Sequence, residues 1–340
     1  MERSLGNIGA MKEADIRPKE LFNRYLELAA KDGSALLADR DSFTEMACPG
    51  CGKKGVPSFL KQGYQYAECR ECGSLFLNPR PSAARMDQFY RQADSVRFWS
   101  SEFYRVTAES RREAMFRPRA EMIADMADRF GIPREATLAD VGAGYGLFLE
   151  EVRRTGRFSR VVAIEPAETL AAVCRDKGFD VVEKTAEAVA AGEFVADMIT
   201  TFEVLEHVND PLAFLTAVGR LMAPGGLAVL TTLTASGFDI QVLWDAAKTV
   251  HPPHHINLMS TTGLERLVGR AELELVELTT PGRLDVDIVI NTLAERPDLP
   301  VDRFVAGLLV APAAARAEFQ AFLAANRLSS HVRIVVRKKS

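Results

Sequence analysis

The pattern of apolar and polar residues becomes regular from about residue 136 onward, where short apolar runs alternate with segments of helical periodicity. The runs have the length and composition of buried strands, and apolar residues recur every three or four positions in the segments between them. Strands are predicted at 137–141, 161–165, 179–182, 197–202 and 226–232, with helices at 146–155, 167–177 and 211–222. Alternation of this kind is typical of βαβ units, so the pattern predicts an α/β fold with a parallel sheet covered on both faces.

The pattern is less regular on either side of these units. Downstream we predict a loose stretch at 234–259, a helix near 261–271, a strand at 273–278, a mostly helical insertion and a last strand at 331–338. Upstream, an Arg-rich helical region has one apolar face, made by Met122, Ile123, Met126, Ala127 and Phe130. We therefore predict a helical segment (1–40), a cysteine-containing ribbon (41–80), a helical cap or linker (81–130) and an α/β domain (131–340) with insertions at 234–259 and 281–328.

Composition and charge narrow the classes of protein. The 340 residues are 47% hydrophobic and 26% charged, which is typical of a globular protein. The 42 basic and 46 acidic residues give a net charge of −4, which offers no overall attraction to nucleic acid or anionic lipid. The apolar run at 304–315 is too short to cross a bilayer, and the N-terminus lacks the apolar core of a signal peptide. We therefore expect a cytoplasmic protein with neither a nucleic-acid partner nor membrane insertion.

Four of the five cysteines form two pairs with the same spacing, and each pair is followed by glycine. Cys48 and Cys51 form one CxxC pair, and Cys69 and Cys72 form the other after a gap of seventeen residues. This spacing predicts a tetrahedral zinc site with four thiolate ligands, which is closed and therefore structural rather than catalytic. Four buried cysteines without a metal is the alternative, but it does not explain the two identical turns. Cys174 lies on a predicted helix among apolar residues, and we expect a buried thiol there.

A glycine-rich loop joins the first strand to the first helix of the α/β domain, in the sequence LADVGAGYG. Glycine at Gly142, Gly144 and Gly146 lets the backbone approach a ligand at the helix N-terminus. The GxGxG spacing and the acid Asp140 disfavour a dinucleotide, because a carboxylate would repel a pyrophosphate. A cationic amino acid suits Asp140, and Glu165 at the end of the second strand suits the two hydroxyls of a ribose. S-adenosylmethionine combines both chemical groups.

These residues resemble the class I S-adenosylmethionine-dependent methyltransferases. The resemblance covers about 136–280 and the final strand, and it rests on DVGAGYG, VVAIEP, DMITTFEVLEHVNDP and LMAPGGLAVLTT. It implies a Rossmann-like sheet of seven strands whose last strand is antiparallel. The resemblance also implies a cofactor site. In this site the glycine loop surrounds the methionine moiety, and Glu165 binds the ribose. The segment after the third strand borders the adenine, and the end of the fourth strand closes the pocket. The cofactor residues so predicted are Asp140, Gly142, Ala143, Gly144, Gly146, Glu165, Thr185, Ala186, Phe202 and Glu203.

The N-terminal half is similar to one subgroup of these enzymes. CPGCG, CRECGSLFLNPRPS and the aromatic pair Phe89 and Tyr90 resemble methyltransferases that carry an N-terminal zinc ribbon. The stretches TTPGRLDVDIVIN and LSSHVRIVVRK strengthen this match. Members of the subgroup modify lipopolysaccharides, surface polysaccharides or deoxysugars. The resemblance therefore implies a small-molecule or carbohydrate-type acceptor, for example a nucleotide-linked sugar.

A histidine-rich segment offers a catalytic base. Methyl transfer is an in-line displacement, so the protein positions the acceptor and removes its proton. Three of the five histidines, among them His254 and His255, fall in HPPHH after the fifth strand, on the side of the sheet where ligands bind. We predict His255 as the base, because the resembling subgroup has a histidine at this point, and His254 as a second candidate. In sugar C-methyltransferases an acid tends to stand at the position of His254.

A second group of candidates lies in FEVLEHV. If this segment is helical, Glu203, Glu206 and His207 share one face and could hold a divalent ion such as Mg²⁺, or His207 could act as a base oriented by Glu206. Ubiquinone-pathway O-methyltransferases look similar at this point. The alternative, which we favour, is that LEHV is a packing and cofactor-loop element common to the whole class.

The densest basic run consists of Arg105, Arg111, Arg112, Arg117 and Arg119. Such runs are usually solvated helix faces paired with nearby acids. The alternative is that one or two of these arginines bind a phosphate of the acceptor, so that replacing Arg111 and Arg112 would raise the acceptor KM.

Three other functions are consistent with parts of the pattern. An RNA methyltransferase could use the ribbon to bind RNA, but the net charge of −4 argues against it. A nicotinamide-dependent oxidoreductase is disfavoured by the GxGxG loop and Asp140. A non-catalytic interaction module would bind the cofactor without turnover.

Overall fold

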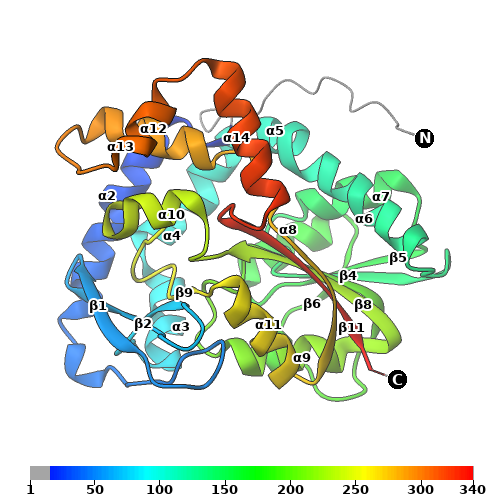
Figure 1. Cartoon of the computed structure of the whole chain (residues 1–340). Coiled ribbons are helices and arrows are strands. Elements are labelled where there is room, and N and C mark those ends of the chain that lie inside the picture. Colours follow the sequence, from blue (N-terminus) through cyan, green and yellow to red (C-terminus); the bar gives the residue numbers. More distant parts are fainter. Residues whose placement is uncertain (1–15, 340) are drawn as a thin grey trace.

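The computed structural model describes residues 16–339, and the first part of the predicted 1–40 segment, residues 1–15, lies outside the described residues. A seven-stranded sheet forms the centre of the α/β part, with the strand order β10-β11-β8-β7-β4-β5-β6 (Figure 1). The strands are β4 (Thr137–Val141), β5 (Arg160–Ile164), β6 (Asp180–Val182), β7 (Ala196–Phe202), β8 (Met222–Leu233), β10 (Leu273–Thr279) and β11 (His331–Lys338). Strands β4 to β8 are parallel, and β11 is antiparallel to both neighbours. The sheet confirms the predicted fold class, including the antiparallel last strand.

Helices cover both faces of this sheet because its strands alternate between two apolar faces. On β4, Leu138 packs into one core and the adjacent Ala139 packs into the other. The first core includes residues of α6 (Arg117–Arg129), α7 (Leu147–Thr155) and α8 (Glu168–Asp176), and the second includes residues of α9 (Pro211–Leu221) and α11 (Thr261–Arg270). The predicted apolar face of the Arg-rich region is confirmed, since Ile123, Met126 and Ala127 are buried in the first core with Met122 and Phe130 packed against them.

The cysteine-containing region forms a second, four-stranded sheet in the order β1-β2-β3-β9. Three strands come from the ribbon, namely β1 (Val56–Lys61), β2 (Tyr64–Glu68) and β3 (Leu75–Leu77). The fourth, β9 (Asn257–Leu258), comes from the loose stretch that follows the histidines. The ribbon therefore does not stand apart from the α/β part, because the two share one sheet.

The remaining helices lie over the ends of the large sheet and beside the ribbon (Figure 1). They are α2 (Lys19–Leu37), α3 (Ala83–Gln92), α4 (Asp94–Phe98), α5 (Tyr104–Arg111), α10 (Phe238–Leu243), α12 (Asp285–Glu295), α13 (Arg303–Leu309) and α14 (Ala313–Ala325). Two π-helical turns, Trp99–Phe103 and Arg112–Phe116, join α4, α5 and α6 into one continuous path. None of the helices within residues 16–339 is both long enough and apolar enough to cross a bilayer.

Candidate functional site

A cavity of about 900 Å³ opens at the carboxyl ends of the parallel strands, where ligands bind in open α/β sheets. Its floor is made by the glycine loop and by the residues that follow β5, β7 and β8. Its roof is apolar and aromatic, with Tyr25, Tyr90, Trp99 and Tyr104 contributed by the helices of the N-terminal half. The cavity is large enough for two small molecules side by side.

Asp140 is the penultimate residue of β4, lies at the floor of the cavity and is almost fully buried. Its only side-chain hydrogen bond within residues 16–339 comes from Thr200 Oγ1, at 2.7 Å from Oδ1. Burial, together with the nearby charge of Glu165, raises the pKa of Asp140 to about 7. A buried carboxylate that forms no ion pair in the described part of the chain favours a cationic ligand in the cavity.

The loop after Asp140 requires glycine. Gly142 has a φ of 79°, in the left-handed region, and a Cβ there would lie 2.7 Å from Val204 Cγ2. Gly144 lines the cavity and donates its backbone N–H to Glu165 Oε2 at 2.9 Å. Glu165, at the end of β5, also accepts the backbone N–H of Ala167 at 3.0 Å. Burial raises the pKa of Glu165 in spite of these two donors.

Most of the predicted cofactor residues line this cavity, namely Asp140, Gly142, Ala143, Gly144, Glu165, Phe202 and Glu203. Three others do not. Gly146 caps α7 at the N-terminus, and a Cβ there would lie 3.1 Å from Cys174 Sγ, so packing explains this glycine. Thr185 and Ala186 start a short 3₁₀ turn outside the cavity lining, and Ala186 belongs to the hydrophobic core. Their predicted adenine contact stays a prediction.

The segment FEVLEHV is not a helix, which corrects the premise of the predicted Glu203, Glu206 and His207 face. The chain bends and turns after β7, and Glu203 has a φ of 56°. Without helical periodicity the three side chains have no common face, and Glu203 does not belong to the group of possible metal ligands found nearby. The i, i+3, i+4 argument fails because the backbone leaves the helical region at Glu203 itself.

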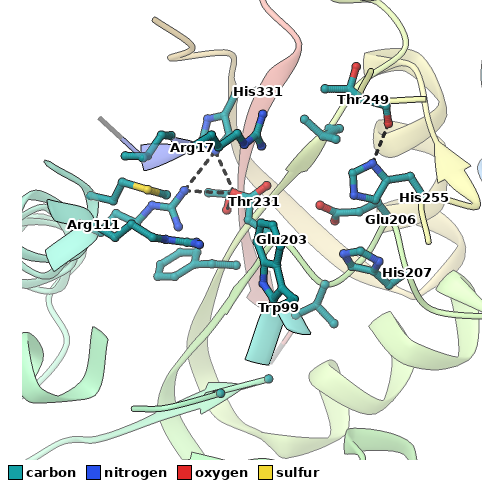
Figure 2. Close-up of a pocket in the computed structure, with 18 of the residues that line it drawn as sticks. Arg17, Trp99, Arg111, Glu203, Glu206, His207, Thr231, Thr249, His255 and His331 are labelled. Atoms are coloured by element: carbon teal, nitrogen blue, oxygen red, sulfur yellow. Dashed lines mark hydrogen bonds and ion pairs between the residues drawn. The ribbon is translucent and has the colours of Figure 1, made fainter. Parts of the chain in front are cut away.

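Glu203 is instead held by three donors that the sequence pattern did not connect. Its Oε1 accepts hydrogen bonds from Thr231 Oγ1 at 2.7 Å, His331 Nε2 at 3.0 Å and Arg119 Nη2 at 3.1 Å (Figure 2). Burial alone would raise the pKa of Glu203, but His331 and Arg119 hold this pKa well below its usual range. The ionised carboxylate of Glu203 is therefore part of the cavity floor. Its partners lie on α6, β8 and β11, far apart in sequence.

Glu206, His207 and His255 lie together on the other side of the cavity from Arg111 (Figure 2). His255 Nδ1 donates to the backbone oxygen of Thr249 at 2.6 Å, and His207 Nδ1 donates to that of His254 at 2.9 Å. Because a carbonyl can only accept, these contacts place the proton on Nδ1 of each ring and leave Nε2 with a free lone pair. Burial lowers the pKa of both histidines, so both rings are neutral.

The same three residues could hold a divalent cation. One ring nitrogen of each histidine and one carboxylate oxygen of Glu206 lie within 4.8 Å of one another. Two imidazoles and one carboxylate suit Zn²⁺, Mn²⁺ or Fe²⁺ better than Mg²⁺, which prefers oxygen ligands. Glu206 Oε2 accepts from Thr232 Oγ1 at 2.7 Å, and burial raises the pKa of Glu206 to about 8. The donor set therefore does not favour the predicted Mg²⁺, and a metal bound here would occupy the Nε2 lone pair of His255 that is otherwise available as a base.

His254 has a different environment from His255. Its ring stacks on that of His251 with the centroids 5.3 Å apart, and Nε2 lies 3.4 Å from Ser95 Oγ. The backbone oxygen of His254, not its ring, contacts His207. The His254 ring therefore has a packing role in addition to lining the cavity.

The four cysteine sulfurs of the ribbon lie within 4.8 Å of one another. Cys48 Sγ is 3.6 Å from Cys72 Sγ, and Cys51 Sγ is 3.4 Å from Cys69 Sγ. A tetrahedron with Zn–S bonds of about 2.3 Å has S···S edges of about 3.8 Å, so the cluster fits a zinc ion. Both pairs form the same turn, in which the N–H of the glycine after the pair donates to the carbonyl of the first cysteine, at 2.8 Å and 2.6 Å. The fifth cysteine, Cys174, is fully buried as expected, and burial raises its pKa to about 11.

The arginine run divides into two groups. Arg105 is exposed, Arg112 forms ion pairs with Glu150 and Glu151, and Arg117 also pairs with Glu151. Of the run, only Arg111 and Arg119 line the cavity, and Arg119 pairs with Glu203. The expectation that Arg112 acts together with Arg111 is therefore wrong, because Arg112 is held outside the cavity by acids of α7.

Arg111 has ring contacts but no ion pair within residues 16–339. Its guanidinium carbon lies 5.0 Å from the ring centroid of Tyr104 and 5.7 Å from that of Trp99. Its Nε is buried and has no hydrogen-bond partner in the described part of the chain. Arg17, near the N-terminal end of α2, also lines the cavity. Arg111 is therefore available to an anionic group in the cavity.

Comparison with known proteins places these features in a family. The family model of the methyltransferase domain matches residues 109–278, which are 170 of the 340 residues. A ubiquinone biosynthesis O-methyltransferase from Cereibacter sphaeroides is 39% identical over 149 residues, covering 38% of this chain and 60% of that protein. One from Xanthomonas oryzae pv. oryzae is 34% identical over 159 residues, covering 42% of this chain and 65% of that protein. The match thus spans less than two thirds of the length of these relatives.

Among solved structures, an amino pentose methyltransferase from Micromonospora echinaspora is 27% identical, with a TM-score of 0.33, over 36% of this chain and 53% of that one. The family model covers half of the chain and includes the glycine loop, Glu165, Glu203 and His207. The chain belongs to the methyltransferase domain family.

Proposed function

We propose that the protein transfers a methyl group from S-adenosylmethionine to a small, carbohydrate-type acceptor that carries an anionic group, with His255 as the base. The observation that carries this proposal is one cavity with two parts. The first part has the buried carboxylates Asp140 and Glu165 beside a left-handed glycine loop. The second part has the lone pair of a neutral histidine, His255, and an arginine that forms no ion pair within residues 16–339, Arg111. This proposal rests also on membership of the methyltransferase domain family.

The first part of the cavity suits the cofactor. Asp140 would attract the ammonium group of the methionine moiety, because it is buried and forms no ion pair within the described residues. Glu165, at the end of the adjacent strand, would accept hydrogen bonds from the ribose hydroxyls. S-adenosylmethionine, when bound, supplies a methyl group on a sulfonium sulfur, which is a cationic electrophile.

The second part suits an acceptor hydroxyl. The acceptor oxygen forms the new bond to the methyl carbon as the bond between that carbon and sulfur breaks, and the acceptor proton passes to Nε2 of His255. The Thr249 carbonyl holds the Nδ1 proton, so the ring presents the basic nitrogen at all times. The products are the methylated acceptor and S-adenosylhomocysteine. The sugar-type acceptor rests on the resemblance of the ribbon region, and its anionic group rests on Arg111, which forms no ion pair within residues 16–339.

The structural role of the zinc ion is part of the proposal. The four sulfurs of the ribbon would bind Zn²⁺ as a closed site, in which no ligand position is left for a substrate. Zinc would then stabilise the ribbon without taking part in methyl transfer.

A labelled-methyl assay tests the function. The full-length protein is incubated with S-adenosylmethionine carrying a labelled methyl group and with nucleotide-linked or phosphorylated sugars. We expect label in the acceptor and S-adenosylhomocysteine as the second product. Label recovered in RNA instead of in any sugar would favour the alternative acceptor class.

Affinity for S-adenosylmethionine should depend on pH through Asp140. With a pKa of about 7, Asp140 is neutral at lower pH and must lose its proton to attract the cation. The dissociation constant should therefore rise by up to about tenfold per pH unit below pH 7 and level off above about pH 8. Calorimetric titration between pH 5.5 and 7.5, where the ammonium group of the ligand keeps its proton, measures this rise, with Asp140→Asn as the control, which should bind weakly at every pH. A wild-type affinity that does not change over this range would contradict the assignment.

Arg111→Ala should raise the acceptor KM by about 10- to 100-fold, since a charge-assisted hydrogen bond in a buried site is lost. The affinity for S-adenosylmethionine should not change. Arg105→Ala is the matched control, because Arg105 is exposed on the same helix, and its KM should equal that of the wild type. A weaker cofactor affinity with an unchanged acceptor KM would assign Arg111 to the carboxylate of the cofactor instead.

A further inference from the structure

We propose that the ribbon positions the base, and that Tyr66 is the positioning residue through which it does so. This inference rests on the proposed role of His255. The ribbon contacts the histidine segment at several points within a few residues of His255, and these contacts include hydrogen bonds to backbone oxygens.

Tyr66 makes the most direct contact between the ribbon and the base. It lies in the middle of β2 with no exposed surface, and its hydroxyl donates to the backbone oxygen of His255 at 2.8 Å. Its ring stacks on Phe59 of the neighbouring strand, with the centroids 5.4 Å apart, which fixes the direction of the hydroxyl. His255 is therefore held from both sides, with Tyr66 at its carbonyl and the Thr249 oxygen at its ring.

Strand pairing holds the residues that follow. Strand β3 pairs with β9, with Phe76 opposite Asn257 and Leu75 opposite Leu258. The Leu77 N–H donates to the Ile256 oxygen at 2.9 Å. Because β3 begins three residues after Cys72, the backbone from residue 256 to 258 is attached directly to the cysteine cluster.

A buried arginine joins the ribbon to the loop after β7, which contains Glu206 and His207. Arg80 is 1% exposed and donates to three backbone oxygens, those of Leu77 at 3.1 Å, Asn209 at 3.1 Å and Ile256 at 3.3 Å. The Ile256 N–H in turn donates to the backbone oxygen of Glu206 at 2.9 Å. Displacement of the ribbon would therefore move His255 and the Glu206 loop together.

The chain provides a matched control for Tyr66. Tyr64 is on the same strand, is 1% exposed, and donates its hydroxyl to a backbone oxygen at the same distance of 2.8 Å. Its acceptor is the backbone oxygen of Gly33 in α2, so this hydrogen bond is not made to the histidine segment itself. Tyr66→Phe and Tyr64→Phe thus remove equivalent buried hydrogen bonds, and only the first one holds His255.

The experiment compares both variants in the full-length zinc-loaded protein. Tyr66→Phe should lower kcat about tenfold, because a small displacement of a base from its acceptor has a large effect on rate. Its dissociation constant for S-adenosylmethionine should stay that of the wild type. Tyr64→Phe should keep kcat within about twofold of the wild type, and the two variants should lose similar thermal stability, because equivalent hydrogen bonds are removed.

A second readout does not depend on activity. With ¹⁵N-labelled histidine, the ring signals of His255 should shift in Tyr66→Phe and not in Tyr64→Phe. Unchanged His255 signals and an unchanged kcat in Tyr66→Phe, or equal changes in both variants, would overturn the inference. If the wild type transfers no methyl group to any acceptor, the proposed function fails, whereas the His255 signals still decide whether Tyr66 positions that ring.

Discussion

Replacing His255 with glutamine is expected to lower kcat by about 10²- to 10⁴-fold, the range typical for the loss of a general base. Glutamine places its amide near the position of Nε2, where it offers no basic nitrogen to the acceptor, and it lacks the ring Nδ1–H that donates to the Thr249 oxygen. The affinity for S-adenosylmethionine should be unchanged, because His255 lies in the acceptor part of the cavity. Steady-state kinetics and calorimetric titration of the same variant measure the two effects separately.

His254→Gln is the control from the same segment. The ring of His254 packs against His251, and the contact that His254 makes with His207 comes from its backbone, which the substitution keeps. We therefore expect a fall in kcat of no more than about tenfold. Equal losses in the His254 and His255 variants would show that the segment matters only for packing and would contradict the assignment of the base.

Replacing Cys69 and Cys72 together with serine should abolish zinc binding and destabilise the protein strongly. Structural zinc contributes about 10–16 kcal/mol of apparent binding free energy in small peptides, so the loss of even part of it should lower Tm by about 10 °C or more. Zinc content by mass spectrometry should fall from one ion per chain to none, and Tm by differential scanning calorimetry should fall with it.

Cys174→Ala is the control for this second prediction. Cys174 is buried next to the glycine loop and lies outside the cysteine cluster, so its replacement should leave one zinc ion per chain. A wild-type protein that contains no zinc, or a double serine variant with the Tm of the wild type, would contradict the zinc site.

The large sheet could be predicted from the sequence because each of its strands and helices is recognisable from the residues of that element alone. Each strand from 137 to 232 is a short apolar run, and each helix between them has one apolar face, so every element is visible within its own window. The CxxC pairs and the glycine loop are also local, because the residues that act together are adjacent in sequence. For the same reason the structure confirms the apolar face of α6 around Ile123.

The rest depends on contacts between distant segments. Strand β9 has two residues, and it forms only because β3, which is about 180 residues earlier, pairs with it. Glu203 meets Arg119 and His331 through the tertiary fold, and no window of the sequence contains all three. The tautomer of His255 is set by the Thr249 carbonyl, which the pattern does not reveal.

The arginine run shows why adjacent residues differ in role. Arg111 ends α5 and Arg112 begins a π-helical turn, so their side chains point in different directions. Arg111 enters the cavity, whereas Arg112 reaches Glu150 and Glu151 of α7. A charge pattern identifies the run, but only the packing of α7 against it separates ligand-facing from structural arginines.

Calorimetric titration of the full-length protein with S-adenosylmethionine, and separately with NAD, tests the central claim most directly. At pH 8, where Asp140 is ionised, the account predicts one molecule of S-adenosylmethionine bound per chain, with a dissociation constant in the micromolar range, and no heat of binding with NAD, because Asp140 would repel a pyrophosphate. Binding of NAD without binding of S-adenosylmethionine would contradict it.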